Sequence, residues 1–178
     1  GGEGFVSTAP WPEYDPSKID VKAEEAESLI KSLMEDTSNI VKATKIEPKR
    51  IIYYVAAPWK WTTYLKVVEE AVSYQKVTMQ NIMRKLMKNP DLRRRAGEVA
   101  KLVGSLISEV NQMPAERREQ ILKVGVLDEE EILKDAEEFL KKTFNAEVKT
   151  YREDDPERYD PKGRSSLAKP YRPAIYIE

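Results

Sequence analysis

The stretch that decides the predicted fold is Ile51-Ile52-Tyr53-Tyr54-Val55-Ala56-Ala57-Pro58. Its first seven residues are apolar, short in extent and rich in β-branched and aromatic side chains, which indicates a central strand buried on both faces. Pro58 lacks a backbone N–H and suits the first turn of a helix, so a helix is expected to begin there. A buried strand that leads directly into a helix favours a domain that combines helices with a sheet.

Apolar residues at helical spacing predict helices on both sides of this strand. The helix before the strand is expected over about residues 20–43, capped by Asp20. Five further helices are expected to begin at Pro58, near Met79, at Asn89-Pro90, at Pro114 and at the capping box Asp128–Glu131. The helix at Asn89 is expected to run without interruption to about residue 112.

The pattern changes after residue 145. Residues 146–151 alternate between buried and exposed types, which indicates a half-exposed strand. A polar loop is expected over 152–172, with Glu153-Asp154-Asp155 as a solvated turn, and a last strand lies within 173–178. The fold class is therefore α/β (or α+β), with a small three-stranded sheet packed by about six helices. Residues 1–19 are interpreted as an extended lead-in, and residues 20–178 as one domain.

Composition excludes most catalytic chemistry. The chain of 178 residues has no His, no Cys and only 7 Gly. Disulfides, thiolate or histidine metal sites and His-based catalysis are excluded, and no phosphate-binding glycine loop occurs. We therefore expect no catalytic residue, metal or cofactor in this chain. Apolar runs are too short for a membrane span, no signal peptide is recognised, and the missing initial Met suggests a piece of a longer cytoplasmic protein.

Charge is unevenly distributed along the chain. Residues 1–47 hold 5 Lys and 10 acidic residues, whereas residues 84–124 hold 10 basic and 5 acidic residues. The segment 162–172 has four basic residues and no acid. Such runs are commonly solvated helix faces, but basic residues interleaved with tyrosines also suit RNA, because cations attract phosphates and rings stack on bases. Both interpretations stay open, as they do for Trp59 and Lys60 at the end of the buried strand.

Two groups of residues resemble a known family. Gly4-Phe5-Val6-Ser7 and Trp11-Pro12-Glu13-Tyr14-Asp15 resemble the junction that follows the anticodon-binding helices of class Ia aminoacyl-tRNA synthetases. Ala56-Ala57-Pro58-Trp59-Lys60-Trp61, Asp160–Arg164 and Arg172–Glu178 resemble the C-terminal domain of leucyl-tRNA synthetases, with the ending closest to the archaeal form. The resemblance covers nearly the whole chain.

This resemblance implies a partner and a role. The family joins leucine to tRNA with ATP in domains that would lie upstream, so ATP and leucine would bind outside this chain. The C-terminal domain of the family binds the long variable arm of leucine tRNA. We therefore expect leucine tRNA and the upstream domains as partners, and a monomer. The alternative is a protein-interaction domain in a synthetase assembly, motivated by the acidic first helix and by Met79, Met83 and Met87 on one helix face.

The resemblance also nominates site residues. Trp59 and Lys60 form one expected contact region and the tail forms the other, and they would make one surface if the tail strand lies beside the central strand. Lys162, Arg164 and Lys169 are expected to hold phosphates, and the Glu178 carboxylate to accept from bases. The tail residues are Arg172, Ala174, Ile175, Tyr176, Ile177 and Glu178. Deletion of the last few residues is expected to weaken RNA binding with little loss of stability.

Overall fold

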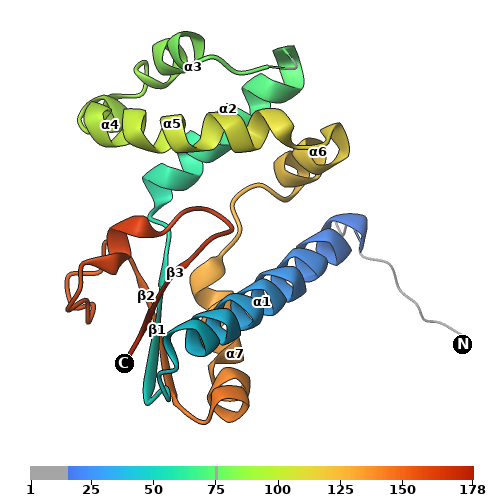
Figure 1. Ribbon diagram of the computed structural model, residues 1–178. Helices are drawn as coiled ribbons and strands as arrows, with labels where there is room; N and C mark the ends of the chain where they lie inside the picture. The colour runs from blue at the N-terminus through green and yellow to red at the C-terminus, as the bar shows by residue number, and fades with distance from the viewer. Residues whose placement is uncertain (1–15, 75) are drawn as a thin grey trace, which may run out of the picture.

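The chain folds into a sheet lobe and a helical lobe (Figure 1). The computed structural model describes residues 16–74 and 76–178, so the lead-in motif from Gly4 to Asp15 lies outside the described residues. The sheet lobe contains α1 (Pro16–Thr44), β1 (Arg50–Val55), α7 (Glu129–Phe144), β2 (Glu147–Arg152), the 3₁₀ turn η1 (Arg164–Leu167) and β3 (Ala174–Ile177). The helical lobe contains α2 (Pro58–Tyr74), α3 (Met79–Leu86), α4 (Pro90–Arg93), α5 (Ala96–Gln112) and α6 (Ala115–Val124).

The predicted central strand is β1. It lies between β2, with which it pairs in parallel, and β3, with which it pairs antiparallel. The side chains of Ile51 to Val55 are all at most 2% exposed. The expectation of a small three-stranded sheet with a strand buried on both faces is confirmed, because β-branched and aromatic side chains fill the space on either side.

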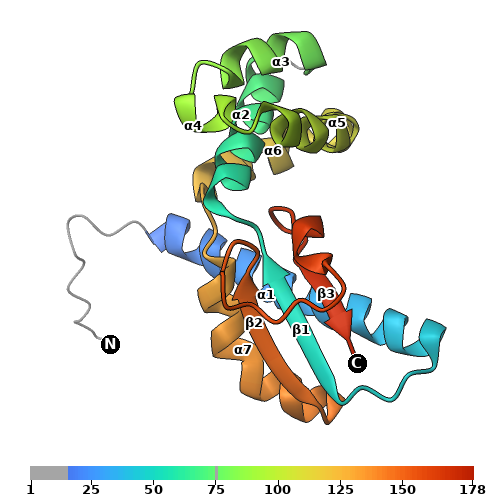
Figure 2. The ribbon, with the colours of Figure 1, turned by 90° about the vertical axis from the view of Figure 1, so that its left-hand side faces the viewer.

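Different parts of the chain cover the two faces of the sheet. Alternate residues of β1, including Tyr53, join the main core beneath α1 and α7, which lie behind the sheet in Figure 2. The Tyr53 hydroxyl is 2.8 Å from the buried hydroxyl of Thr37 on α1. Ile52 and Tyr54 face the other side, where they pack against Ala168 and Ala174. The long loop after β2 therefore forms part of the hydrophobic packing.

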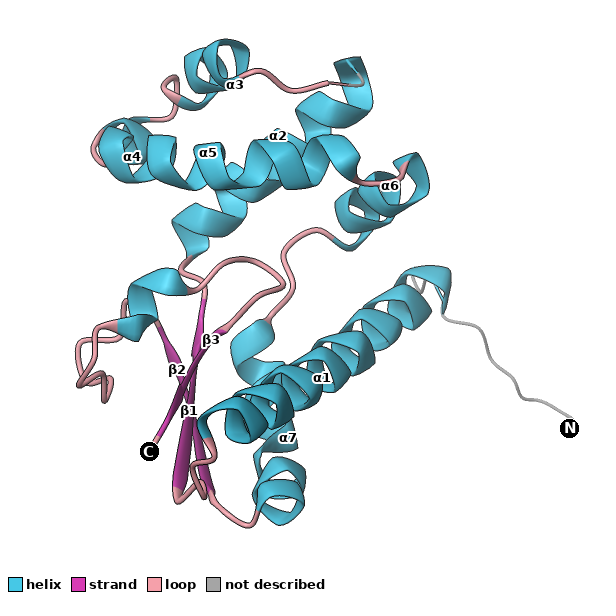
Figure 3. Cartoon of the chain, viewed as in Figure 1, coloured by secondary structure: helices cyan, strands magenta, loops and turns pink. Residues whose placement is uncertain are grey.

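Helix boundaries differ from the predictions at two places. Helix α1 begins at Pro16, so Asp20 lies inside the helix and not at its predicted start. The helix expected over 89–112 is divided into α4 and α5, with a break at Arg94 and Arg95 (Figure 3). The break falls where consecutive arginines are exposed and no side chain is anchored in the core. The described residues thus form seven α-helices, one more than predicted.

Other helix ends follow their local signals. Asn89 caps α4 by accepting from Asp91 N–H at 2.9 Å. Helix α6 stops at Gly125, whose φ of +73° favours glycine. The Asp128 side chain accepts from Glu131 N–H at 3.1 Å and begins α7 as predicted. No helix within residues 16–74 and 76–178 is long and apolar enough to cross a membrane.

Candidate RNA interface

The nominated residues divide into two groups at opposite ends of β1. The tail strand lies beside the central strand, with Tyr54 opposite Ala174 and Ile51 opposite Ile177. Because this pairing is antiparallel, Glu178 lies at the amino end of β1, whereas Trp59 follows its carboxyl end. Six strand residues span about 20 Å. The expected single surface is therefore two surfaces.

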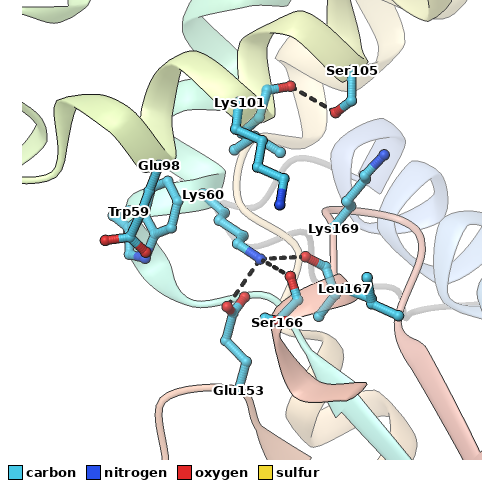
Figure 4. Close-up of a pocket in the computed structure, with 11 residues that line it drawn as sticks. Trp59, Lys60, Glu98, Lys101, Ser105, Glu153, Ser166, Leu167 and Lys169 are labelled. Carbon is cyan, nitrogen blue, oxygen red and sulfur yellow. Dashed lines mark hydrogen bonds and ion pairs between the residues drawn. The ribbon is translucent and has the colours of Figure 1, made fainter. Parts of the chain in front are cut away.

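The first surface, here called the upper groove, lies between the start of α2, the face of α5 and η1 (Figure 4). It encloses about 340 Å³. Leu167, 62% exposed, and the exposed Lys101 lie at its rim, and the half-buried Lys169 also lines it. The groove is lined by Trp59, Lys60, Glu98, Lys101, Leu102, Ser105, Glu153, Ser166, Leu167, Ala168 and Lys169.

Lys60 is buried beneath this groove. Its side chain is 6% exposed, and its Nζ lies 2.9 Å from Glu153 Oε1. The same ammonium donates to the carbonyl oxygens of Ser166 at 3.1 Å and Ala168 at 2.7 Å. These three partners use all three donors of an ammonium group. The expectation that Lys60 itself contacts RNA is therefore replaced by an indirect role, in which it fastens the loop after β2 to the start of α2.

Glu153 is the acidic partner in this anchor, and not a solvated turn residue. Its other oxygen accepts from Ala57 N–H at 3.0 Å. Burial raises the pKa of Glu153, and the hydrogen bond and charge of Lys60 work in the opposite direction. Because breaking a buried pair leaves an uncompensated charge, the pair constrains the loop strongly.

Trp59 presents its ring to the same groove. The ring is half-buried, with Lys60 Nζ at 5.6 Å and the Arg95 guanidinium at 5.0 Å from its centroid. A cation above an aromatic face is an attractive contact. Trp61, by contrast, is a core residue at 3% exposed, as its position on the apolar stripe predicts.

Lys169 and Arg172 close a tight turn at the far end of the groove. Their backbones pair, with N–H to oxygen distances of 3.1 and 2.8 Å, and Tyr171 between them has a φ of +66°. The Arg172 guanidinium lies 2.8 Å from Glu109 and stays 71% exposed. The Tyr171 N–H donates to the buried carboxylate of Glu129 at 3.1 Å. The turn therefore presents two cations on a fixed backbone.

The second surface is the tail cluster, formed by Arg50, Tyr159, Tyr176 and Glu178. The Glu178 carboxylate accepts from both tyrosine hydroxyls, at 3.0 and 2.9 Å, and from Arg50 at 3.0 Å. These hydrogen bonds raise the pKa of each tyrosine and lower that of Glu178. Glu178 is thus an organising carboxylate, and its oxygens are already engaged by partners of this chain.

Two aromatic rings and a cation surround that carboxylate, with Tyr159 exposed and Tyr176 and Arg50 half-buried. The rings of Tyr159 and Tyr176 have centroids 6.4 Å apart, and the Arg50 guanidinium lies 5.2 Å from the Tyr159 centroid. Sequence reasoning missed Arg50 and Tyr159. The only signal available was their residue type, because the pairing joins positions 128 residues apart along the chain.

The outer edge of β3 displays backbone groups. Arg50 and Glu178 exchange two backbone hydrogen bonds, of 3.0 and 2.9 Å. Alternation along an antiparallel ladder then directs the N–H and C=O groups of Ile175 and Ile177 away from β1. Their side chains pack against the main core, while Ala174 is 8% exposed. Ile175 and Ile177 therefore offer backbone groups at the edge visible in Figure 2.

Lys162 and Arg164 lie on the loop beside this edge. Both are exposed, and neither forms an ion pair with another described residue. Asp160 shapes this part of the loop by accepting from Arg164 N–H at 2.8 Å and from the Ser165 hydroxyl at 2.5 Å. Among residues 16–74 and 76–178, no group of three or more acidic side chains is placed to hold a metal ion.

Comparison with known proteins gives the family. No family model matches the chain. A leucine–tRNA ligase of Methanothrix thermoacetophila is 37% identical over 177 residues, which cover 99% of this chain. The chain is homologous to a segment of the archaeal leucine–tRNA ligases. Ligases of Pyrococcus abyssi and Methanocaldococcus jannaschii are 37% and 34% identical, each over 100% of this chain.

The chain spans only a small part of these leucine–tRNA ligases. It corresponds to 18% of the Methanothrix protein, 16% of the Pyrococcus protein and 17% of the Methanocaldococcus protein. The resemblance to leucyl-tRNA synthetases is thereby confirmed.

Proposed function

We propose that this chain is the C-terminal tRNA-binding domain of a leucyl-tRNA synthetase, and that it holds the long variable arm of leucine tRNA. Leucylation, with ATP and leucine, would take place in upstream domains that the chain does not include. The observation that carries the proposal is the edge of β3, where outward backbone groups of Ile175 and Ile177 lie on a strand that also carries the half-buried Tyr176. The relatives are named leucine–tRNA ligases, which supports only the broader statement that this chain belongs to such a ligase.

The edge suits unpaired bases at the tip of an RNA arm. Protein readout of RNA concentrates on single-stranded tips, where bases are free to stack and to hydrogen-bond along their edges. The outward N–H and C=O groups of Ile175 and Ile177 supply donors and acceptors at a fixed spacing. Tyr176 and Tyr159 supply stacking faces, while Lys162 and Arg164 attract the backbone phosphates.

The upper groove would contact the same RNA through charge. Lys101 is exposed and Lys169 is half-buried at its rim, Arg172 lies just beyond it and is 71% exposed, and Trp59 offers an aromatic wall. Lys60 acts indirectly, because its hydrogen bonds to the loop carbonyl oxygens, including that of Ser166, hold the loop that forms this rim in place. The binding constant should therefore fall steeply with salt concentration.

The primary test compares two RNAs. A gel-shift titration of the 178-residue chain would use leucine tRNA, either intact or with its variable arm shortened. We expect markedly weaker binding of the shortened RNA. Equal affinities for the two would reject the variable-arm proposal.

A residue-level test uses the direction of the backbone groups. Ile177→Pro removes an N–H that points away from β1, so the ladder to β1 loses no bond. We expect RNA affinity to fall about tenfold for the loss of one hydrogen bond to RNA. Lys162→Gln with Arg164→Gln should reduce the salt dependence, while the exposed Lys149→Gln on the opposite edge serves as the charge control.

Deletion of the tail is a poorer test than substitution. Strand β3 pairs with four residues of β1, and Ile175 and Ile177 pack against the core. Removing them exposes an apolar surface, so the structure argues against the expectation that deletion spares stability.

A docking role is the second candidate. An apolar hollow of about 450 Å³ lies between α1 and α7, lined by Ala26, Glu27, Ile30, Lys31, Met34, Ile132, Asp135 and Ala136. The methionine face that first suggested docking is largely core, since Met83 and Met87 pack inward and Met79 alone is 40% exposed. A pull-down that retains protein partners after nuclease treatment would favour docking in a synthetase assembly, and Ile30→Asp should then weaken it.

A further inference from the structure

A second basic hollow lies on the helical lobe, away from both proposed RNA surfaces. It is formed by the end of α2 and by α3, which lie at the end of the molecule opposite the C-terminus in Figures 1 and 2. Its volume is about 330 Å³, and it is lined by Glu70, Tyr74, Lys76, Asn81, Arg84, Lys85 and Lys88.

The charge of this hollow is strongly positive and mostly uncompensated. Lys85 Nζ lies 2.7 Å from Glu70 Oε1, and this is the one ion pair among the described residues that line it. Lys76, Arg84 and Lys88 are exposed and form no ion pair with another described residue. Residues 76–95 hold seven basic residues against Asp91 alone. Such a field attracts a polyanion.

An exposed aromatic ring stands at the rim. Tyr74 is 66% exposed, and Lys85 Nζ lies 4.8 Å from the centroid of its ring. The ammonium fixes the ring on one side and leaves most of it accessible to solvent. An aromatic ring beside several cations is the arrangement on which single-stranded nucleic acids stack.

The wall of the hollow contains an acceptor that lacks a donor. Glu70 is 5% exposed, and its Oε2 is shielded from solvent and has no hydrogen-bond partner, so a ligand in the hollow reaches it only when the Glu70 carboxylate turns outward. A buried charged oxygen left unpaired is unfavourable, so a ligand that brings an N–H donor gains from binding there. Phosphate oxygens cannot donate, whereas the exocyclic amino groups of cytosine, adenine and guanine can.

We propose that this hollow binds one unpaired RNA nucleotide whose base carries an exocyclic amino group. The base stacks on Tyr74 and donates to the Glu70 carboxylate, which turns outward to meet it, and the flanking phosphates contact Lys76, Arg84 and Lys88. This is an RNA contact additional to the tail cluster, and it requires neither β3 nor the variable arm. An RNA that reaches both surfaces would be held at two ends of the domain.

The experiment is a fluorescence-anisotropy titration of the 178-residue chain with short labelled oligo(C) and oligo(U). Cytosine carries the exocyclic amino group from which Glu70 would accept a hydrogen bond, whereas uracil carries a carbonyl oxygen in its place. We expect oligo(C) to bind about tenfold more tightly, as a hydrogen bond to a charged group implies. Glu70→Gln should reduce that preference. The double variant Arg84→Gln with Lys88→Gln should lower the affinity for both oligonucleotides.

Tyr74→Ala is the decisive variant because the side chain is exposed and its loss should leave the fold intact. We expect this variant to bind oligo(C) about tenfold more weakly, as the loss of one stacking contact implies. Lys31→Gln on α1 is the matched charge control. The C-over-U preference should persist in Ile177→Pro, which separates this site from the tail.

Two outcomes would overturn the assignment. One is equal binding of oligo(C) and oligo(U) by the wild-type chain, and the other is unchanged oligo(C) binding by Tyr74→Ala. Binding to phosphatidylserine vesicles that depends on Tyr74, without binding of oligo(C), would also overturn it, since the hollow would then face a membrane.

Discussion

The buried carboxylate of Glu129 makes the stability of this domain depend on pH in a defined direction. Its side chain is 2% exposed at the start of α7, where Oε2 accepts from Tyr171 N–H at 3.1 Å and Oε1 has no partner. Burial raises the pKa of Glu129 to about 8, although the hydrogen bond from Tyr171 works to lower it.

The sign follows from proton counts. The unfolded carboxyl titrates near 4.5. Between that pH and about 8, the folded state holds a proton that the unfolded state has lost. The contribution of Glu129 to the free energy of unfolding is therefore full below pH 4.5 and declines as pH rises towards 8. The difference between the two pKa values corresponds to a change of at most about 5 kcal/mol in the free energy of unfolding.

The perturbation is Glu129→Gln, which keeps an oxygen for Tyr171 N–H and cannot ionise. We expect urea denaturation to give similar free energies of unfolding for the two proteins near pH 5. The variant should be more stable by a few kcal/mol near pH 9, because only the wild type must charge a buried group.

The comparison needs a control for the other titrating groups. Glu131→Gln removes an exposed carboxylate two residues further along α7. Its free energy of unfolding should stay close to that of the wild type at both pH values. Wild type and Glu129→Gln share every other ionisable group, so the difference between them isolates Glu129. Free energies of unfolding that move in parallel from pH 5 to pH 9 would refute the reasoning.

Three further substitutions test the packing. Lys60→Met should lower the free energy of unfolding in urea by about 3–5 kcal/mol, because it leaves the buried carboxylate of Glu153 without its cation. The control Lys101→Met, at an exposed lysine, should change the free energy of unfolding by less than about 0.5 kcal/mol. Similar losses for the two variants would contradict the proposed Lys60–Glu153 anchor. Asn89→Ala should cost about 1 kcal/mol in a thermal melt through loss of the α4 cap, and no change would show that the cap is dispensable. Thr37→Val should cost about 1–3 kcal/mol by removing the partner of a buried hydroxyl, and combining it with Tyr53→Phe should recover part of that loss; additive losses would argue against the coupling.

Local pattern predicted most of the fold. The run from Ile51 to Val55 identifies the central strand, and Pro58 and Asp128 mark helix starts, because each signal lies within a few residues of its effect. The break between α4 and α5 was missed, since apolar spacing continues across Arg94 and Arg95 and shows no interruption.

The candidate site was less predictable because its geometry depends on distant pairing. Nothing local to Lys60 indicates burial, and its partner Glu153 reads as one of three acids in a polar loop. The antiparallel direction of β3, which separates Trp59 from Glu178, is likewise set by contacts across the whole domain. Charge and aromatic content predicted which segments matter, but not which side chains remain exposed.

The pairing of β1 with β3 has a consequence for the order of folding. Arg50 and Glu178 meet across 128 residues, and the intervening chain contains the complete helical lobe. Contacts within α2–α6 are local and form quickly, whereas closing so long a loop is slow. We therefore expect pulse-labelled hydrogen exchange to protect the amides of α5 before the amide of Ile52, which faces β3. Simultaneous protection would contradict this order. A sheet that is completed last leaves its central strand open on one edge while the helices are already in place, and during that interval the domain is most exposed to mispairing with other chains.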